Sequence, residues 1–328
     1  MERFEILVIG AGPAGLATGI EAGRAGLRCV ILDKGGVAHN ISRFQRDMPF
    51  FSTPELLEIG EVPFVVPTAR PTSLDCVNYY HAVTAHYRLD CRLYRRAVSV
   101  RRDSAGFTVA ASGGESYAAA NVVIAAGYYD TPKKLGVPGE DLPHVSSYYR
   151  DPLPFYRQKV LIAGGKNSAV EAALDLWRHG AEVTVAHRGT TLSGGVKYWI
   201  LPDFENRVAS GAISLLTGTT VAEFRPGVTV LRGAAGARLE RPTDFAFTLI
   251  GYDADTKFLR ECGVDIAAET GAPVHDPRTM ETNVPGLYVA GGLVGGRFNN
   301  KIFIENGRQH GTLIAAAIAG SRSAAAAF

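Results

Sequence analysis

The sequence predicts an α/β protein that contains two Rossmann-like dinucleotide-binding domains. Two segments support this fold class, ILVIGAGPAGLA at 6–17 and VLIAGGKNSAVEAA at 160–173. Each passes from an apolar strand through a glycine-rich turn into an alanine-rich helix, and a second apolar strand follows, at 27–33 and at 182–188. The chain has 328 residues, which suffices for two domains of about 100–200 residues, each with its own apolar core.

The first turn matches the dinucleotide-binding pattern G-x-G-x-x-G at Gly10, Gly12 and Gly15. The first glycine permits the tight turn, the second lets the backbone approach a pyrophosphate, and the third allows close packing of helix and strand. The helix that follows presents free N–H groups and the positive end of its dipole to the phosphates. Because the strands and the helix fall in the expected places around the pattern, we expect this turn to bind a dinucleotide.

The two units make opposite demands on the adenosine ribose. Asp33 follows Gly10 by 23 residues and His187 follows Gly164 by the same interval, which puts both at the end of a second strand. Asp33 can accept a hydrogen bond from a free 2′-hydroxyl and would repel a 2′-phosphate, whereas His187 and Arg188 offer cationic groups that suit a phosphate. We therefore expect FAD, or else NAD, at the first turn and NADPH at the second. The alternative for Arg188 is a solvated charge at a strand end.

Lys166 occupies a position of the second turn where a residue that offers only backbone is expected. Its side chain takes up room beside the pyrophosphate, and a cation at the N-terminus of a helix opposes the helix dipole. A bound diphosphate reverses the sign of this effect. We therefore expect weaker but real dinucleotide binding, with capping and phosphate contacts from Asn167 and Ser168. The alternative is a turn that no longer binds a nucleotide.

The remaining segments indicate that the first domain is discontinuous. NVVIAAGYYDTP at 121–132 is a strand that ends in small residues and a turn, and TNVPGLYVAGG at 282–292 repeats this plan before a final alanine-rich helix. A C-terminal segment so rich in glycine cannot form a domain alone, so we expect it to complete the first one. The predicted layout is an FAD-binding domain of residues 1–129 and 253–328, with an NADPH-binding domain of residues 130–252 inserted between them.

Composition and charge are those of an ordinary globular protein. The net charge of +2 gives no indication of binding to nucleic acid or a membrane surface, and no apolar run reaches the ~18 residues of a membrane span. The apolar N-terminus lacks a basic region and contains glycines, so we expect no signal peptide. The eight histidines form no cluster, and the cysteines form no C-x-x-C pair, which fits a reducing compartment. We expect a cytoplasmic protein without a metal site.

Two dinucleotides on one chain suggest electron transfer between them. Passing a hydride from one nicotinamide to another gains nothing, whereas transfer from a nicotinamide to a flavin opens one- and two-electron chemistry. The protein must then bring nicotinamide C4 to about 3–3.5 Å from flavin N5, and rotation of one domain would gate this approach. The sequence thus predicts an NADPH-dependent flavoprotein.

Over nearly its whole length the chain resembles the low-molecular-weight thioredoxin reductases. The motifs that carry the resemblance are VIGAGPAGLA, VVIAAG, LIAGGKNSA, HRG and PGLYVAGG. In that family a catalytic C-x-x-C lies just before the second nucleotide-binding strand. The matching positions here are Ser147, Tyr148, Tyr149 and Arg150. Because the dithiol is absent, reduction of thioredoxin by that route is excluded.

A narrower resemblance is to the bacillithiol disulfide reductase family. It rests on FFSTPELLEIGEVPF at 50–64, the lysine of GGKNSA, KYWILPDF at 197–204, IFIENGRQHG at 302–311, and Gly292, where thioredoxin reductases have an aspartate. The resemblance implies FAD, NADPH and reduction of the disulfide of a cysteine-containing glycoconjugate, in a cytosolic homo-oligomer. In that family the position of Ala14 usually holds a cysteine, which is its proposed redox thiol.

Ala14 leaves the thiol chemistry open. Disulfide exchange needs a thiolate, and none of the four cysteines lies in a motif that places it at the flavin. Either the reduced flavin acts on a bound disulfide directly, or another thiol reaches the site, or the acceptor is not a disulfide.

The predicted sites combine the motifs with this resemblance. The predicted FAD site comprises Gly10, Gly12, Pro13, Ala14, Gly15, Asp33, Lys34, Phe51, Ser52, Val98, Ala126, Gly127, Gly291 and Gly292. The predicted NADPH site comprises Gly164, Gly165, Lys166, Asn167, Ser168, Ala169, His187, Arg188, Lys197 and Gly251. For Phe51 and Ser52 the alternative is loop packing, and for Lys197 a solvated loop charge. The catalytic residues are not identified. Glu305 and His310 are candidates for a proton shuttle to reduced flavin, with packing at a helix start as the alternative.

Three functions remain open. The first is an NADPH-dependent reductase of a small thiol disulfide. The second is an electron-transfer flavoprotein similar to the thioredoxin-reductase-like ferredoxin–NADP reductases, acting on ferredoxin or flavodoxin. In that case the six arginines of RLDCRLYRRAVSVRR at 88–102 would dock an acidic redox protein, and turnover would depend strongly on salt. The alternative for this cluster is a solvated face, because its apolar residues alternate as in half-exposed strands. The third is a sensor whose flavin reports the level of NADPH with negligible turnover.

Overall fold

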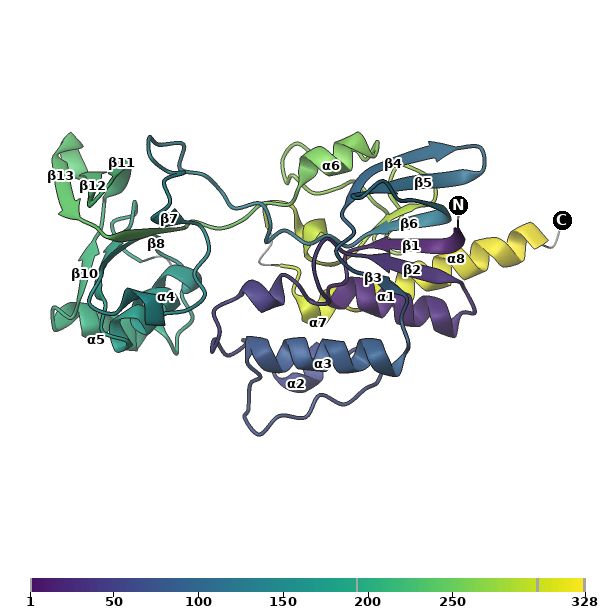
Figure 1. Cartoon of the computed structure of the whole chain (residues 1–328), viewed down its shortest axis with the longest axis horizontal. Coiled ribbons are helices and arrows are strands. Elements are labelled where there is room, and N and C mark those ends of the chain that lie inside the picture. The colour runs from purple at the N-terminus through teal and green to yellow at the C-terminus, as the bar shows by residue number, and fades with distance from the viewer. Residues whose placement is uncertain (1, 193, 299–300, 327–328) are drawn as a thin grey trace. The chain divides into compact units, whose positions relative to one another are not determined.

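The computed structural model describes residues 2–192, 194–298 and 301–326 (Figure 1). The chain forms two compact units. The first unit contains residues 1–42, 46–131 and 253–328, and the second contains residues 43–45 and 132–252. The chain thus passes between the units at 131/132 and 252/253. The sequence predicts these boundaries at 129/130 and 252/253. Residues 43–45, which precede the first boundary, also belong to the second unit.

The first unit is built on a seven-stranded sheet. Six strands lie side by side in the order β3 (Cys91–Arg92), β2 (Cys29–Leu32), β1 (Arg3–Ile9), β6 (Ser116–Ile124), β5 (Gly106–Ala111), β4 (Ala97–Asp103). The first four of these strands are parallel, while β5 and β4 form an antiparallel hairpin. The second half of β6 also pairs in parallel with β15 (Leu287–Val289), so the C-terminal segment completes the sheet.

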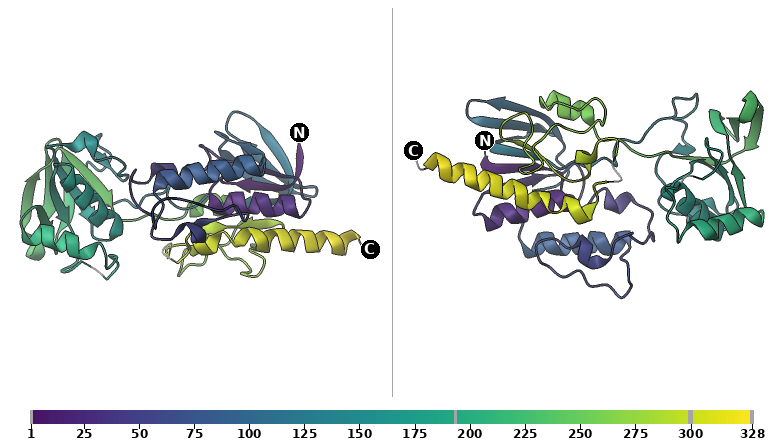
Figure 2. Two further views of the ribbon diagram at one scale, coloured as in Figure 1. Left: turned by 90° about the horizontal axis from the view of Figure 1, so that it is seen from below. Right: turned by 180° about the vertical axis from the view of Figure 1, so that it is seen from behind.

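Helices pack around this sheet (Figure 2). They are α1 (Pro13–Arg24), α2 (Pro54–Leu57), α3 (Ser73–His86), α6 (Thr256–Glu261), α7 (Ile304–Gly307) and α8 (His310–Ala326), with short 3₁₀ turns η1 (Ile41–Arg43) and η4 (Gly291–Gly295). Helix α1 lies beside α8. Gly311 permits this contact, because a Cβ there would come within 2.7 Å of the Thr18 backbone nitrogen.

The second unit is a five-stranded parallel sheet with different layers on its two faces. The strand order is β10 (Ile213–Leu216), β9 (Glu182–Ala186), β8 (Lys159–Gly164), β14 (Phe245–Leu249), β7 (Val145–Ser146). Helices α4 (Asn167–Arg178) and α5 (Leu201–Ala209) cover one face, on which Val160, Ile162 and Val185 are buried. The antiparallel strands β11 (Thr220–Arg225), β12 (Val228–Arg232) and β13 (Arg238–Pro242) cover the other, and the short turns are η2 (Leu153–Phe155) and η3 (Ala234–Gly236).

The predicted fold class is confirmed by this architecture. Both glycine-rich turns join a parallel strand to a helix, β1 to α1 and β8 to α4, as the sequence predicts. The strand that follows the helix of each dinucleotide-binding motif is shorter than predicted. Strand β2 ends at Leu32 and β9 ends at Ala186, whereas the predicted ends are residues 33 and 188. In the described part of the chain, no helix has both the length and the apolar character that crossing a membrane requires.

Candidate functional site

The three glycines of the first turn have different structural roles. Gly10 has φ +119°, and a Cβ there would lie 2.4 Å from the Ala125 carbonyl oxygen. A Cβ on Gly15 would lie 1.9 Å from the carbonyl oxygen of Gly10. By contrast, a Cβ on Gly12 would meet no atom within 4 Å. The fold itself therefore requires Gly10 and Gly15, whereas glycine at position 12 leaves the backbone open to a ligand.

Asp33 shapes the first turn through both carboxylate oxygens. One accepts a hydrogen bond from the Ala11 backbone N–H at 2.7 Å, and the other accepts one from the Gly35 N–H at 2.8 Å. The carboxylate is half-buried and lies directly beyond β2, at the carboxyl end of the strand. Each oxygen has a further lone pair, so the predicted bond to a ribose hydroxyl stays compatible with this arrangement. Its neighbour Lys34 forms an ion pair with Asp130 at 2.7 Å.

A buried acceptor without a donor lies beside the end of β6. Asn40 donates to the Asp130 carboxylate at 3.1 Å, but its buried side-chain oxygen has no hydrogen-bond partner among the described residues. Gly127, with φ +71°, lies next to it, because a Cβ there would be 3.6 Å from the Asn40 amide nitrogen. Buried polar atoms are nearly always satisfied in native proteins, so a polar group of a bound cofactor fits this position. No sequence motif marks Asn40 or Asp130.

Two small residues meet where the first turn contacts the C-terminal segment. A Cβ on Gly291, which has φ +74°, would lie 2.9 Å from the Ala14 Cβ. The next residue, Gly292, leaves room for the ring of Tyr128, whose nearest carbon would be 2.7 Å from a Cβ at that position. Burial raises the pKa of Tyr128. Position 14 therefore faces the turn after β15, and the glycine that replaces the aspartate of thioredoxin reductases accommodates an aromatic ring.

The segments 50–64 and 302–311, which carry the narrower resemblance, meet in the first unit. Ser52 donates a hydrogen bond to the Glu305 carboxylate. Arg308 donates to the backbone carbonyl oxygens of Glu55, at 3.0 Å, and of Glu58. These hydrogen bonds thus hold helix α7 and the residue that follows it against the segment that contains α2. These contacts are the loop packing that is the alternative for Ser52, and they show Glu305 hydrogen-bonded within the protein.

The other predicted FAD contacts fall in three places. Pro13 is the first residue of α1, and the backbone of Ala126 lies against the first turn, 3.2 Å from a Cβ at Gly10. Phe51 is half-buried in the loop before α2. Val98 is 51% exposed on the edge strand β4, whereas the backbone N–H groups of Tyr94 and Arg95 are the ones that bond to the loop of residues 33–35.

His310 holds the turn at Gly291 by a hydrogen bond. Its side chain is only 9% exposed, and its Nδ1 accepts from the Gly291 backbone N–H at 3.1 Å. Nδ1 therefore carries no proton. Burial lowers the pKa of His310 to about 4, with a smaller contribution from His275. At neutral pH the side chain is thus a neutral imidazole that orients backbone, which does not favour the predicted role as a proton shuttle.

This environment predicts an acid-dependent loss of stability that His310→Asn removes. Between about pH 6.5 and 4 the unfolded chain binds a proton at His310 that the folded chain does not, so the free energy of unfolding falls as the pH falls. Asparagine retains an acceptor for Gly291 but does not titrate. Urea unfolding at several pH values between 4.5 and 7.5 is expected to show a shallower decline for this variant. The exposed His81→Asn serves as the control, and parallel curves for His310→Asn and wild type would contradict the assignment.

His187 forms a wall of the second turn. A Cβ on Gly165 would lie 2.2 Å from the His187 Nδ1, so the ring lies against this glycine. Its Nε2 donates to the Thr191 carbonyl oxygen at 3.1 Å. The imidazole therefore supports the loop after β9, and Arg188 carries the exposed cationic charge there. In the described part of the chain Arg188 forms no ion pair, so its guanidinium is available to a phosphate.

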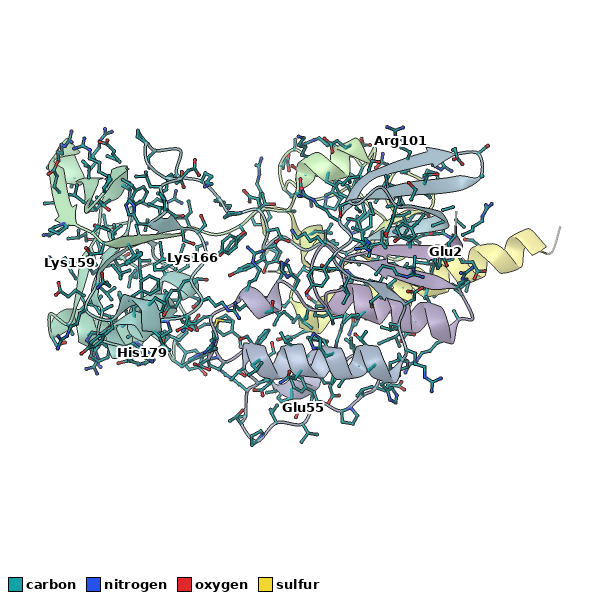
Figure 3. All side chains as sticks on the ribbon, viewed as in Figure 1. Glu2, Glu55, Arg101, Lys159, Lys166 and His179 are labelled. Carbon is teal, nitrogen blue, oxygen red and sulfur yellow. The ribbon has the colours of Figure 1, made fainter. Side chains whose placement is uncertain are left out.

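Lys166 is the N-cap residue of α4, and no side chain caps this helix (Figure 3). The predicted capping by Asn167 is wrong, because its side-chain oxygen accepts from the Lys197 backbone N–H at 2.8 Å. This bond brings the loop of Lys197 beside the turn, with the ammonium group 5.6 Å from the Trp199 ring. Ser168 is exposed in the first turn of α4. The free N–H groups and two lysines make this helix start suitable for a diphosphate.

The remaining residues of the predicted NADPH site lie at closely packed positions around the second turn. A Cβ on Gly164 would lie 2.7 Å from both the Ala169 Cβ and the Leu249 carbonyl oxygen, so these residues set the spacing of β8, α4 and β14. Gly251 has φ +101°, and its carbonyl oxygen accepts from the Lys133 backbone N–H at 2.9 Å. It lies just after β14, on the same edge of the sheet as the turn.

Lys166→Met is expected to separate the two effects of this lysine. Removing a cation from the N-terminus of α4 stabilises the nucleotide-free protein by roughly 0.3–1 kcal/mol. The same change removes a positive charge beside the diphosphate that NADPH and NADH share, so the affinity for both falls by a similar factor. Urea unfolding and titration of each nucleotide measure the two effects. Unchanged affinity for both nucleotides would place the lysine outside the site.

None of the cysteines is poised as a thiolate. Cys29, Cys76, Cys91 and Cys262 are free thiols, and Cys76 is buried in α3. Burial raises the pKa of each thiol to about 12. Because the thiolate is the reactive form, these four groups are unreactive at neutral pH. The first turn has Ala14 in the place where the resemblance implies a thiol.

Comparison with known proteins agrees with this geometry. The family model for pyridine nucleotide-disulphide oxidoreductases matches residues 7–291, which include both glycine-rich turns. The chain belongs to this family. Its members are oxidoreductases that use FAD and NADPH. The orphaned acceptor of Asn40, the open backbone at Gly12 and the uncapped start of α4 fit these two cofactors.

Several relatives match almost end to end. The bacilliredoxin reductase Bdr of Bacillus subtilis (strain 168) is 39% identical over 319 residues, which cover 97% of this chain and 98% of the relative. The solved bacillithiol disulfide reductase Bdr from Bacillus cereus is 37% identical with a TM-score of 0.95, and covers 98% of this chain and 100% of its own. The thioredoxin reductase of T. acidophilum, at 21% identity and a TM-score of 0.78, covers the same shares and shares the fold.

Proposed function

We propose that this protein is an NADPH-dependent, FAD-containing reductase of a low-molecular-weight thiol disulfide, with bacillithiol disulfide as the substrate. One NADPH and one proton reduce one disulfide to two thiols and leave NADP⁺. The oxidoreductase class follows from the family, and the names of the relatives at 37–39% identity support the substrate. The first unit would hold FAD and the second NADPH.

The pair of turns with opposite charges carries this proposal. The first turn presents open backbone at Gly12 beside the carboxylate of Asp33, which suits a dinucleotide with a free ribose hydroxyl. The second presents Lys166, Arg188 and Lys197 and has no acidic side chain in the first turn of α4, which suits a nucleotide with an additional phosphate. One chain can therefore take electrons from NADPH and hold a flavin.

We further propose that no thiol of the protein takes part. The bound FAD supplies two-electron chemistry between a nicotinamide and an acceptor. The four cysteines are protonated at neutral pH because burial raises the pKa of each to about 12. Ala14 and Gly291 contribute no reactive group where they meet. The backbone of Gly291 packs closely against the Ala14 methyl group, because a Cβ on Gly291 would lie 2.9 Å from it.

Anaerobic turnover with defined disulfides tests the proposed function. Purified protein is mixed with NADPH and bacillithiol disulfide, and the thiols formed are counted against the NADPH consumed. We expect two thiols for each NADPH, and a much slower reaction with cystine as the control disulfide. Reduction of the flavin by NADPH without formation of thiol would overturn the substrate assignment and leave the cofactor assignment intact.

A second candidate function is electron transfer to an acidic redox protein such as ferredoxin or flavodoxin. Three arginines at the edge strand β4 are exposed, and in the described structure they form no ion pairs: Arg96, Arg101 and Arg102, of which Figure 3 labels Arg101. Arg88 is also exposed without an ion pair, but it lies before β3, at the other end of the strand order. Ferredoxin–NADP reductases that are 23–27% identical match 88–89% of the chain. Reduction of ferredoxin that slows strongly between 50 and about 300 mM salt would favour this function, because salt screens steering by charge.

The resemblance also supports a cytoplasmic location and a homo-oligomer, which we include in the proposal. No partner nucleic acid or membrane is proposed. Light scattering of the purified protein is expected to give a mass above the 35.0 kDa of one chain.

A further inference from the structure

The space between the two sheets of the second unit is apolar over most of its area. Leu161 and Ala186 of the five-stranded sheet pack there against Phe224 and Leu231 of the three-stranded sheet. Side chains alternate between the faces of a strand, so residues two positions away share this interior face. By this rule polar side chains also face inward, namely Thr184 on β9, Ser214 on β10, Thr229 on β12 and Arg241 on β13, together with Lys159 at the start of β8 and Glu182 at the start of β9.

These polar positions gather at one end of the unit, where a groove of about 600 Å³ opens. Its lining includes Lys159, Leu161, Thr184, Ser214, Arg241 and Pro242. Lys159 begins β8, Thr184 is the middle residue of β9, and Ser214 is the second residue of β10, so no lining residue of these strands lies at a carboxyl end. The second glycine-rich turn lies at the carboxyl end of the same strands, and Figure 3 labels Lys159 and Lys166 at opposite ends of β8. The groove is therefore distinct from the predicted NADPH site.

Two buried polar atoms at this end have no partner. The Nε of Arg241 and the hydroxyl oxygen of Thr229 are both inaccessible to solvent, and neither has a hydrogen-bond partner among the described residues. The two residues pair directly across β12 and β13, so their side chains are neighbours on the inward face. An unmade hydrogen bond of a buried group costs roughly 1–3 kcal/mol. Two such groups side by side indicate that something else bonds to them.

The charges around the groove are mainly positive. Lys159 and Arg241 line it, and no carboxylate within the described ranges lies at ion-pair distance from either. Glu182 also lines the groove but is exposed and forms no ion pair with them. Asp244, which follows β13, uses its carboxylate to accept from the Lys159 backbone N–H at 2.7 Å. The groove is therefore lined by two cations without an ion pair, Lys159 and Arg241, by the hydroxyls of Thr184 and Ser214, and by one carboxylate, that of Glu182.

We propose that the groove binds a small molecule through an oxyanion group, a carboxylate or a phosphate. The guanidinium of Arg241 presents a fork of donors that matches the two oxygens of such a group. The hydroxyls of Thr184 and Ser214 line the same groove, and Lys159 adds a charge at its rim. Thr229 lies beside Arg241 on the paired strand β12. The volume of about 600 Å³ accommodates a molecule of metabolite size with part of its body against Leu161 and Pro242.

Selenate is a suitable probe, because its selenium gives an anomalous X-ray signal. The holoprotein is crystallised with saturating NADPH, which occupies the nucleotide site, and is soaked in selenate. Calorimetric titration of the same complex gives the affinity in solution. We expect an anomalous peak within hydrogen-bond distance of Arg241, and binding at least tenfold weaker in Arg241→Met. The matched control is Arg238→Met, an exposed arginine of the same strand that pairs with Glu240.

Competition identifies the source of the oxyanion. If inorganic phosphate displaces selenate better than malonate does, the ligand carries a phosphate, and the reverse order indicates a carboxylate.

Methionine retains an unbranched apolar stem in place of that of Arg241 and leaves no buried polar nitrogen without a partner, so Arg241→Met is expected to retain the unfolding temperature. Lys159→Met gives an independent variant with an intermediate loss of affinity. Three results would overturn the proposal. They are a water molecule in place of selenate at Arg241, equal binding of selenate by Arg241→Met and wild type, and an anomalous peak in crystals without binding in solution, which would mean an adventitious ion only.

Discussion

Gly12→Val is expected to give folded protein that contains no FAD and is colourless. A side chain at this position meets no atom of the protein within 4 Å, so the fold tolerates it. The same side chain occupies the space through which the pyrophosphate would reach the backbone. Overpacking costs roughly 1–3 kcal/mol, and lost backbone hydrogen bonds add to this, so we expect FAD binding to be weaker by more than about 100-fold. The ratio of absorbance at 450 and 280 nm measures the flavin content.

Gly23→Val is the matched control for this experiment. Gly23 lies in helix α1, of which Gly12 is the N-cap residue, and a Cβ on Gly23 also meets no atom within 4 Å. This variant is expected to remain yellow, while circular dichroism shows native secondary structure for both variants. A yellow Gly12→Val protein with full flavin content would refute the placement of FAD at the first turn.

Arg188→Ala is expected to change the choice between the two nicotinamide nucleotides. Hydrogen bonds to charged groups contribute about 1.5–3 kcal/mol, so kcat/KM for NADPH should fall by roughly 10–150-fold. NADH has no 2′-phosphate, and its kcat/KM should stay within about twofold of the wild-type value. Initial rates of flavin reduction with each nucleotide give the comparison.

The control for the nucleotide experiment is Arg178→Ala, which removes another exposed arginine from the second unit. Arg178 lies at the end of α4 and forms an ion pair with Asp203 at 2.6 Å, so its loss should leave both rates unchanged. Equal losses with NADPH and NADH in Arg188→Ala would mean that the guanidinium does not read the 2′-phosphate. Lys197, whose loop lies beside the turn, would then be the next candidate for contact with the 2′-phosphate.

The sequence was informative where the structural signal is local. Both glycine-rich turns were predictable because strand, turn and helix follow one another within about 15 residues and the glycines have fixed geometric tasks. The equal spacing of Asp33 and His187 correctly marked the ends of two equivalent strands. It did not reveal that His187 turns its ring onto Gly165, because a side-chain direction depends on the loop that follows.

The parts that sequence reasoning missed depend on contacts between distant segments. Ser52 and Glu305 are 253 residues apart, and Asn40 and Asp130 are 90 residues apart, so no local pattern joins them. The capping predicted for Asn167 failed for the same reason, since the loop at Lys197 competes for its side-chain oxygen. His310 likewise gained its role from Gly291, which another part of the C-terminal segment supplies.

Thiol formation by cysteine variants decides whether this chain reduces a disulfide with NADPH and without a thiol of its own. Four single variants, Cys29→Ala, Cys76→Ala, Cys91→Ala and Cys262→Ala, are compared with wild type under anaerobic conditions with bacillithiol disulfide. We expect two thiols for each NADPH and similar rates in all five proteins, because burial raises the pKa of each cysteine thiol to about 12. A variant whose flavin is still reduced by NADPH but which forms no thiol would contradict this expectation.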